Sequence, residues 1–384
     1  MTIRPLNFRH HPWRQSLNDE LHARPPLPIT APMLVSYLAL VSGAENLGQE
    51  RERLKQLAEA NNLALPPAGA AHCLLHTPHF ILKWERHNEF SSYTFFAPPQ
   101  QPARSGEVAL RHVDPAWLAQ LPGQLMVATH VEVLAANDHA PALVLQELLT
   151  PGEVIVASRI GGQAAWVFTD FRLDAETGFS RFTLIDESLG RLRAGRSLQR
   201  LLEIETYRLM ALLAFPIAKE VGKFVARAEE ELAALIDRIG QTQATAETTA
   251  DTTNNAEESA ILHDLTRLAA EVEHSIARTN FRFGASAAYY RLVQQRVNEL
   301  KESHVSGLPT IRGFMERRLA PALNTCATMA RRQNELSARI ARTSQLLRTR
   351  VDLALEEQNQ QLLTQMNRRA KSNCICKKRW KACR

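Results

Sequence analysis

Two short segments of the chain concentrate the side chains that proton transfer or ion-pair recognition requires. The first, Trp84 to Glu89, reads WERHNE, and the second, Asn18 to Arg24, reads NDELHAR. Either segment supplies an acid, a base or a carboxylate clamp. If the two segments meet in space, five residues become candidates for a ligand-binding site: His22, Arg24, Glu85, Arg86 and His87.

A purely structural interpretation of the same residues stays open. Phe80 to Arg86 and Ser91 to Phe96 are predicted to form a hairpin, in which Glu85 and Arg86 make cross-strand pairs and the intervening residues form the turn. Arg24 would then cap or salt-bridge a short helix near the N-terminus. A binding site therefore requires a pocket that joins the two segments.

Histidines and cysteines do not show the spacing of a metal site. His72, His76 and His79 lie in a segment predicted to be extended, where residues four apart are roughly 13 Å from one another. Three cysteines within residues 374–383 lack the paired spacing and the fourth ligand of a zinc site. The sequence also lacks the common nucleotide-binding and hydrolase motifs. We expect no metal and no cofactor, and an enzymatic activity is less expected than a non-enzymatic role.

The first half of the chain is predicted to form an α+β domain with a mixed or antiparallel sheet. Alternating or apolar runs indicate seven strands, at Met33–Val41, Phe80–Arg86, Ser91–Phe96, Leu125–Leu134, Val154–Ile160, Ala164–Asp170 and Phe179–Asp186. Helices are predicted at Trp13–Leu21, Leu47–Ala60 and Pro115–Leu121.

From Ser188 the apolar residues recur with the 3.6-residue period of a helix. Pro216 should kink or restart the first helix, and Gly240 should end the second. The sequence is therefore divided into an α+β domain (1–187), a helical hairpin or kinked helix (188–240), a flexible linker without bulky apolar residues (241–258), long antiparallel helices (259–371) and an abnormal tail (372–384).

The last predicted helix is far longer than is usual in a globular domain. From Pro321 to Lys371 it has 51 residues, or roughly 76 Å at 1.5 Å per residue. Aliphatic side chains follow one stripe of this helix: Leu336, Ile340, Leu347, Val351, Leu355, Leu362 and Met366, with Thr343 among them. This pattern indicates a helical bundle or an imperfect coiled coil, and it predicts a homo-oligomer held together by the long helices.

The net charge of +6 does not indicate nucleic-acid binding. Residues 372–384 carry five basic residues and no acid, which leaves +1 for the other 371 residues. A nucleic-acid-binding protein would show a basic face within its folded part. No nucleic-acid partner is expected.

The tail SNCICKKRWKACR differs abruptly in composition from the helix that precedes it. Back-translation of residues 373–384 and regrouping from the third base of each codon gives a string that continues an amphipathic helix. A reading-frame slip is therefore predicted, and a genuine cysteine-rich basic tail stays the alternative.

The sequence as written predicts a cytoplasmic protein. No run reaches the roughly 20 apolar residues that cross a bilayer. The first thirty residues are rich in charges and lack the apolar core of a secretory signal.

Four strings resemble a bacterial family of unknown function whose members are labelled uncharacterised membrane-anchored proteins. They are NDELHARP (18–25), WERHNEFSSYTF (84–95), TNFRFGASAAYYRLVQQRVNELKE (279–302) and LLRTRVDLALEEQNQQLLTQMNRRAK (346–371). The resemblance implies an apolar anchor directly after the long helix and a place at the inner membrane for the intact form. Here the basic tail stands at that position, which puts anchoring of this chain in doubt.

The order of parts is also similar to that of CorA-type magnesium channels, which place an α+β domain before long helices and a membrane segment. The Gly-Met-Asn signature of those channels is absent, and a shared layout is weak evidence. Three hypotheses follow: a non-enzymatic, self-associating domain of a membrane-anchored protein, a CorA-like transport protein truncated before its pore, and a ligand-binding or enzymatic α+β domain.

Overall fold

The computed structural model describes residues 8–15, 17–18, 25–64, 70–100, 106–148, 154–246 and 253–382, and within them it leaves the side chains of 243–246, 253–255, 357–358 and 370–382 undescribed. The chain divides into two compact units. The first comprises Met1–Leu212 and Ala288–Pro321, and the second comprises Leu213–Ala287 and Ala322–Arg384. Both units are therefore discontinuous in sequence.

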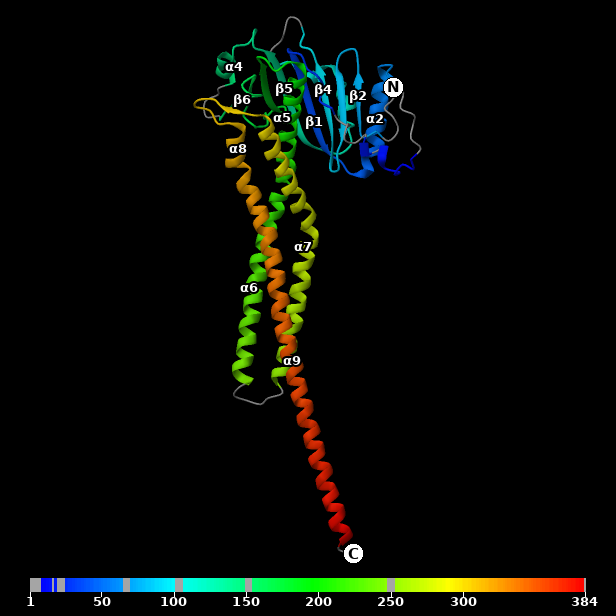
Figure 1. Ribbon diagram of the computed structural model, residues 1–384, viewed down its shortest axis with the longest axis vertical. Helices are drawn as coiled ribbons and strands as arrows, with labels where there is room; N and C mark the ends of the chain where they lie inside the picture. Colours follow the sequence, from blue (N-terminus) through cyan, green and yellow to red (C-terminus); the bar gives the residue numbers. More distant parts are fainter. Residues whose placement is uncertain are drawn as a thin grey trace. The chain divides into compact units, whose positions relative to one another are not determined.

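The first unit is built on one mixed sheet, which confirms the predicted α+β class (Figure 1). In the described residues the sheet has nine strands in the order β2-β3-β4-β1-β5-β8-β7-β6-β9. Their bounds are β1 Met33–Val41, β2 His72–His76, β3 Ile81–Arg86, β4 Phe90–Ala97, β5 Gln124–Ala135, β6 Val156–Ile160, β7 Ala165–Thr169, β8 Ser180–Asp186 and β9 Ser303–His304. All pairs are antiparallel except β5 with β8.

The pleat of the strands separates two faces, and helices cover both. One face carries Leu38, Leu82 and Trp84, which form a core with α2 (Leu47–Ala60), α3 (Pro115–Leu118) and the segment around η2 (Ala109–His112). Farther along this face, α4 (Pro141–Leu148) packs on β6, β7 and β8. The opposite face is covered by α5 (Arg191–Leu212). Side chains on both faces of β3 and β4 are consequently buried.

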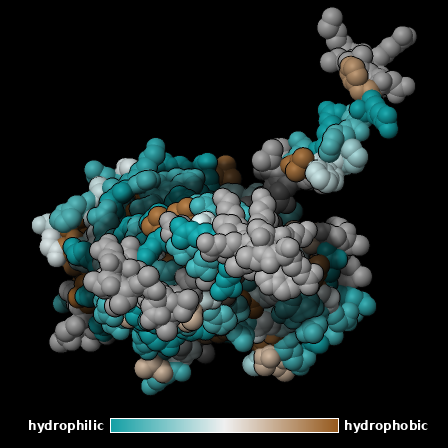
Figure 2. Space-filling view, turned by 90° about the horizontal axis from the view of Figure 1, so that it is seen from below, coloured by the Kyte–Doolittle hydropathy of each residue, from teal (hydrophilic) through white to brown (hydrophobic). Residues whose placement is uncertain are grey.

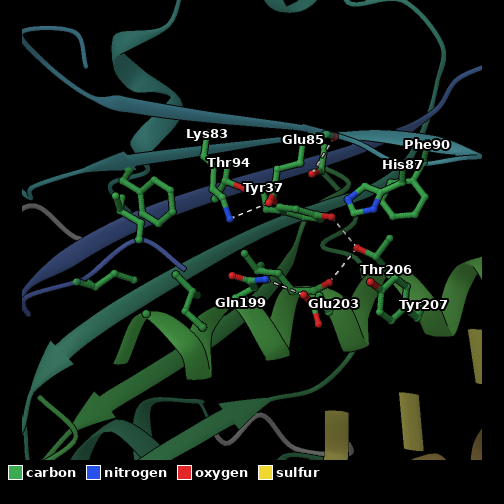
Figure 3. Close-up of a pocket in the computed structure, with 17 residues that line it drawn as sticks. Tyr37, Lys83, Glu85, His87, Phe90, Thr94, Gln199, Glu203, Thr206 and Tyr207 are labelled. Atoms are coloured by element: carbon green, nitrogen blue, oxygen red, sulfur yellow. Dashed lines mark hydrogen bonds and ion pairs between the residues drawn. The ribbon is translucent and has the colours of Figure 1, made fainter. Parts of the chain in front are cut away.

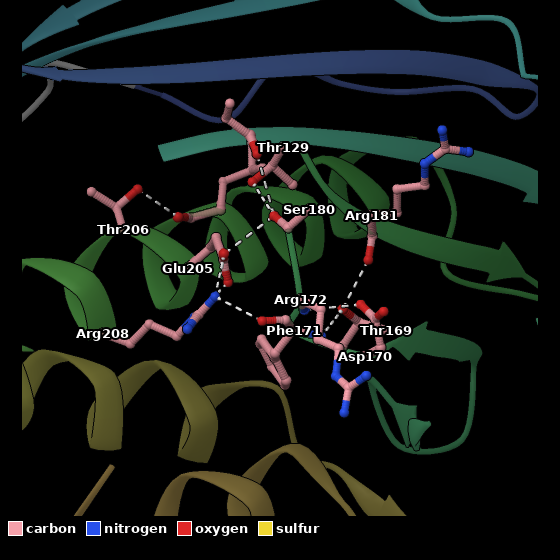
Figure 4. A network of polar contacts seen from close by, with 12 residues as sticks. Thr129, Thr169, Asp170, Phe171, Arg172, Ser180, Arg181, Glu205, Thr206 and Arg208 are labelled. Atoms are coloured by element: carbon pink, nitrogen blue, oxygen red, sulfur yellow. Dashed lines mark hydrogen bonds and ion pairs between the residues drawn. The ribbon is translucent and has the colours of Figure 1, made fainter. Parts of the chain in front are cut away.

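A buried carboxylate ties α5 to the centre of the sheet (Figure 4). Glu205 of α5 is fully buried, and its Oε1 accepts a hydrogen bond from Ser180 Oγ of β8 at 3.2 Å. Ser180 in turn bonds Thr129 of β5 at 2.8 Å. Arg208 neutralises the charge, because its Nε lies 2.7 Å from Glu205 Oε2. The guanidinium of Arg208 also lies over the ring of Phe171, 5.1 Å from its centroid. These contacts fix where α5 lies on the sheet.

The second unit is a bundle of three long helices, α6 (Ala214–Ala246), the first part of α7 (Thr253–Glu299) and α9 (Ala320–Ala382). Aliphatic side chains from all three helices form its core, including Leu232, Leu265 and Leu336. Ion pairs such as Arg332 to Glu229, 2.5 Å apart, join the helices at the rim. The short helix α8 (Ile311–Arg318) precedes α9 and belongs to the first unit.

The helices differ from the sequence predictions at the proposed linker. Helix α6 continues through Gly240 to Ala246, and α7 begins at Thr253, so both ends of the predicted flexible segment 241–258 are helical. Gly240 does not end the helix because the bundle covers the side chains around it: Ile239 packs on the apolar core and Thr242 is 3% exposed. A helical glycine costs about 1 kcal/mol relative to alanine, and tertiary packing supplies most of the stability of such a helix.

Other boundaries also differ. Helix α9 continues to Ala382, through most of the predicted tail, and α4 lies in a segment for which no helix was predicted. The predicted helix Trp13–Leu21 falls partly outside the described residues.

The buried histidine of β5 should make the stability of the first unit depend on pH. His130 stacks on Phe179 with ring centroids 4.0 Å apart, and its Nδ1 lies 2.9 Å from Ser36 Oγ. Burial, together with the positive charge of Arg181, lowers the pKa of His130 to about 4 from 6.5. The unfolded chain therefore takes up the proton first as the pH falls, and the folded state loses stability between about pH 6.5 and pH 4.

We predict that the free energy of unfolding falls about 2 kcal/mol less between pH 7 and pH 5 in His130→Asn than in the wild type. Denaturant unfolding at both pH values measures this loss. His139→Asn, at an exposed histidine, is the matched control and should lose stability as the wild type does. An identical pH dependence in His130→Asn and the wild type would contradict the assignment.

Candidate functional site

A pocket of about 50 Å³ lies between α5 and the face of the sheet formed by β1, β3 and β4 (Figure 3). Polar side chains enter it from both walls. Those used below are Tyr37, Lys83 and Glu85 from the strands, and Gln199, Glu203 and Thr206 from α5. The volume is enough for roughly three to five water molecules, or for a small polar compound.

The strand wall carries a buried ion pair. Lys83 and Glu85 are two residues apart on β3, so the pleat points both side chains to the α5 side of the sheet. Lys83 Nζ lies 2.9 Å from Glu85 Oε1, and each residue is only 8% exposed. Two opposite charges removed from water in this way must neutralise each other, because an isolated buried charge is strongly destabilising.

The helix wall carries an amide and a second carboxylate. Gln199, Glu203 and Thr206 are spaced by four and three residues, which places them on one face of α5. Gln199 Nε2 donates to Glu203 Oε1 at 2.9 Å. The other oxygen of Glu203 is held by Arg296 of α7, within the first unit. Gln199 and Arg296 therefore hold the two oxygens of the Glu203 carboxylate and fix its orientation.

A chain of hydroxyl groups connects the two walls. Thr206 Oγ1 donates to the carbonyl oxygen of Leu202 at 2.8 Å, and its single hydrogen is thereby used. The hydrogen bond of 2.8 Å between Tyr37 and Thr206 is consequently donated by Tyr37. Burial raises the pKa of the Tyr37 phenol, so this group stays protonated at any physiological pH.

A close backbone contact sets the edge of the pocket. The carbonyl oxygen of Leu27 would lie 2.0 Å from a Cβ atom at Gly195 of α5. Only glycine lets the segment before β1 cross the helix at this distance. Next to this crossing, the backbone N–H of Ile29 donates to the carbonyl of Arg191 at 3.0 Å. Leu27 and Ile29 both line the pocket.

The pocket has hydrogen-bonding capacity that its own residues do not use. Gln199 Oε1 is buried and accepts no hydrogen bond from the described residues. Lys83 offers three N–H donors, and Glu85 is its one ionic or hydrogen-bonding partner among those residues. A spare acceptor and spare donors thus line one small cavity, and Figure 3 shows them on opposite walls.

The sequence-based site residues divide between the two faces of the sheet. Glu85 and His87 line the pocket, where His87 stacks on Phe90 with ring centroids 4.3 Å apart. Arg86 points to the other face, and its NH1 pairs with Glu50 Oε2 of α2 at 2.9 Å. His22 and Arg24 lie outside the described residues. The structure therefore brings Glu85 and His87 together and separates Arg86 from them.

The contact of Arg86 is structural. Glu50 is fully buried, and its carboxylate also accepts hydrogen bonds from Ser91 Oγ at 2.8 and 2.9 Å. Arg86 NH2 donates to the carbonyl oxygen of Gly43 at 2.7 Å. Arg86 thus joins the hairpin to α2 through its ion pair with Glu50, a residue of this helix rather than of the neighbouring strand of the hairpin.

The sequence-based analysis missed the residues that α5 contributes. Gln199, Glu203 and Thr206 fall between the leucines of an amphipathic helix, where polar side chains usually face water. One signal was present in β4, whose sequence FSSYTFFA carries aromatic residues on both faces and so indicates a strand covered on both sides.

Metal ligands do not cluster in the part of the chain that the structure describes: it contains no group of three or more His, Cys, Asp or Glu residues that could hold an ion. His72 and His76 occupy the two ends of β2. The side chains of Cys374 and Cys376, and the whole of Cys383, lie outside the description.

A model of a family described as a protein of unknown function, DUF3422, matches residues 9–374. The chain belongs to the DUF3422 family. No curated protein and no solved structure matches it. The predicted membership of a family of unknown function is confirmed, whereas membrane anchoring and likeness to CorA channels stay predictions. Across the described residues of this DUF3422 protein, none of the helices has the length and apolar character needed to cross a bilayer.

We predict that Arg86→Met lowers the free energy of unfolding by about 3–5 kcal/mol, because it leaves the Glu50 carboxylate buried without a cation. The double variant Arg86→Met/Glu50→Gln should recover part of this loss. Lys55→Met, which removes an exposed pair with Glu59 on the same helix, is the control and should change stability by less than about 1 kcal/mol. Equal effects of the Arg86 and Lys55 substitutions in denaturant unfolding would contradict the structural role.

Proposed function

We propose that the first unit binds a small polar molecule in the pocket under α5. The observation that carries this proposal is the coexistence of free volume, a spare buried acceptor and spare buried donors in one place. Buried polar groups are normally satisfied, because each unsatisfied one destabilises the fold by about 1–3 kcal/mol. A bound molecule would supply the missing partners.

The arrangement favours binding over catalysis. Each carboxylate of the pocket is already held by a cation, Glu85 by Lys83 and Glu203 by Arg296. A general base needs a carboxylate that is free to take a proton from a substrate. The hydroxyl of Thr206 is likewise engaged at both its hydrogen and its oxygen. These groups are placed to hold a ligand rather than to transform it.

We predict that a small polar compound stabilises the full chain against unfolding. A ligand present at one hundred times its Kd raises the free energy of unfolding by about 2.7 kcal/mol. The measurement is thermal unfolding with a panel of small amino acids, carboxylic acids, amines and polyols.

The double variant Lys83→Met/Glu85→Gln removes both charges together and should abolish the stabilisation. Lys55→Met on α2 serves as its control and should respond as the wild type does. Absence of stabilisation by any compound of the panel, or equal stabilisation of wild type and double variant, would contradict ligand binding in this pocket.

A second proposed function is self-association through α9. Leu336, Ile340 and Leu347 are buried in the bundle, but the same helix extends past α6 and α7 (Figure 1). There Leu355, Leu362 and Met366 are 46%, 52% and 67% exposed. Figure 2 shows hydrophobic side chains between hydrophilic ones on this extension. The apolar stripe is thus buried by α6 and α7 in its first part and exposed in its second part, which favours a binding partner for the exposed part.

The spacing of the open stripe favours a second copy of the chain as that partner. Leu355, Asn359, Leu362 and Met366 follow one another at intervals of four, three and four residues. This is the alternation of the two core positions of a coiled coil. A single asparagine among apolar core residues is typical of helices that pair with themselves in a defined register.

We predict that the full chain is a dimer or larger oligomer and that Leu355→Glu/Leu362→Glu shifts it toward monomer. Light scattering on the purified protein measures both states. Leu346→Glu, at an exposed leucine of the same helix outside the stripe, is the control and should keep the oligomer. A monomeric wild-type protein, or an oligomer that tolerates both stripe substitutions, would contradict self-association through this surface.

We further propose that an apolar segment behind the long helix holds the intact family form at the inner membrane. The support is the resemblance of the four sequence strings and the frame-shifted reading of residues 373–384. Sequencing the gene from codon 366 onward tests this proposal. We expect the shifted frame to encode a segment of about 20 apolar residues. A stop codon directly after residue 384 with no such segment in any frame would contradict the anchor.

A further inference from the structure

We propose that the pocket under α5 recognises a small zwitterion of the amino-acid type, with its carboxylate on Lys83 and its ammonium group on Gln199. This inference rests on the proposed function of the pocket and names the class of its ligand. It follows from the unused donors and acceptors of the pocket, its charge balance and its volume.

The donor side of the pocket is the ammonium group of Lys83. It is buried, and it spends one ionic contact on Glu85 at 2.9 Å. An ammonium group has three N–H donors and no acceptor, so any further partner must offer an acceptor. A carboxylate is the acceptor that forms the strongest hydrogen bonds with such a group. Lys83 therefore selects the carboxylate end of the ligand.

The acceptor side is the amide oxygen of Gln199. Oxygen and nitrogen of an amide are distinguished by their partners, and here Nε2 must face Glu203, which can only accept. Oε1 is thereby fixed as the buried atom that has no donor among the described residues. Across the hydroxyl chain, Tyr37 of β1 donates its hydrogen to Thr206, and the side chain of Ser92 also hydrogen-bonds with the Tyr37 oxygen. Gln199 Oε1 on the helix side of the pocket can therefore accept a hydrogen bond from a donor-rich group such as an ammonium.

The charge balance of the walls favours a ligand without net charge. Lys83 is neutralised by Glu85, and Glu203 is neutralised by Arg296. A lone anion or cation would bring an uncompensated charge into a pocket that excludes most water, which is unfavourable. A zwitterion brings both signs at once and leaves the sum at zero. Acetate and methylammonium, which each carry half of its charges, should therefore bind worse than glycine.

The volume limits the ligand to few atoms. About 50 Å³ holds roughly three to five water molecules, which is comparable to glycine or alanine and too small for an aromatic amino acid. The apolar part of the wall, Leu198 and Leu202 of α5, can cover a methyl group. The pocket thus favours the smallest members of the class.

Isothermal titration calorimetry of the full chain with glycine, acetate, methylammonium, glycerol and phenylalanine tests the inference. We expect glycine to bind at least tenfold more tightly than each of the other four, or about 1.4 kcal/mol in binding free energy. Tighter or equal binding of acetate, methylammonium or glycerol would overturn the zwitterion while leaving a small-molecule pocket in place. Binding of none of the five would overturn this inference, and the broader compound panel then decides the proposed function separately.

Two glutamine variants locate the binding on the named atom. Gln199→Met keeps the length of the side chain and removes the amide, so glycine affinity should fall at least tenfold. Gln56→Met is the matched control, because Gln56 also donates to a glutamate of its own helix, Glu52, but lies on the exposed face of α2. Equal glycine affinities of the two variants, with both folded by circular dichroism, would overturn the assignment.

Discussion

The ion pair between Lys83 and Glu85 is the interaction around which the first unit is organised. Two charged side chains on one strand face are usually left in water, but here α5 covers them and leaves each 8% exposed. The helix can lie there because Glu205, neutralised by Arg208 of the same helix, bonds Ser180 of β8, and because Gly195 admits the backbone of Leu27. The result is a polar layer between helix and sheet that encloses a small cavity among the described residues.

The pleat of β3 lets one short segment serve two purposes. Trp84 and Arg86 face α2, where Arg86 neutralises the buried Glu50 and joins helix and hairpin. Lys83 and Glu85 face α5 and form the pocket. Charged residues that look alike in the sequence thus divide into a residue that joins the hairpin to α2 and a pair that lines the pocket, and a shift of register by one residue would exchange their faces.

The sequence predicted the sheet well and the pocket only in part. Period-two alternation identified β3, β4 was predicted as its hairpin partner, and alternating or apolar runs identified β1 and β5 to β8. Glu85 and His87 were found as a dense polar group. Gln199 and Glu203 were not, because only the tertiary placement of α5 turns an exposed-looking helix face toward the sheet. The helical end of α6 inside the predicted linker was missed because composition alone does not report tertiary packing such as that of Ile239 on the bundle core.

We propose that the layer between α5 and the sheet is a binding site rather than a filled part of the core. A crystal structure of the full chain grown with saturating glycine tests this proposal. We expect a glycine carboxylate oxygen about 3 Å from Lys83 Nζ and the glycine nitrogen about 3 Å from Gln199 Oε1. Ordered water alone at these two atoms, or closure of the space by the surrounding side chains, would contradict it.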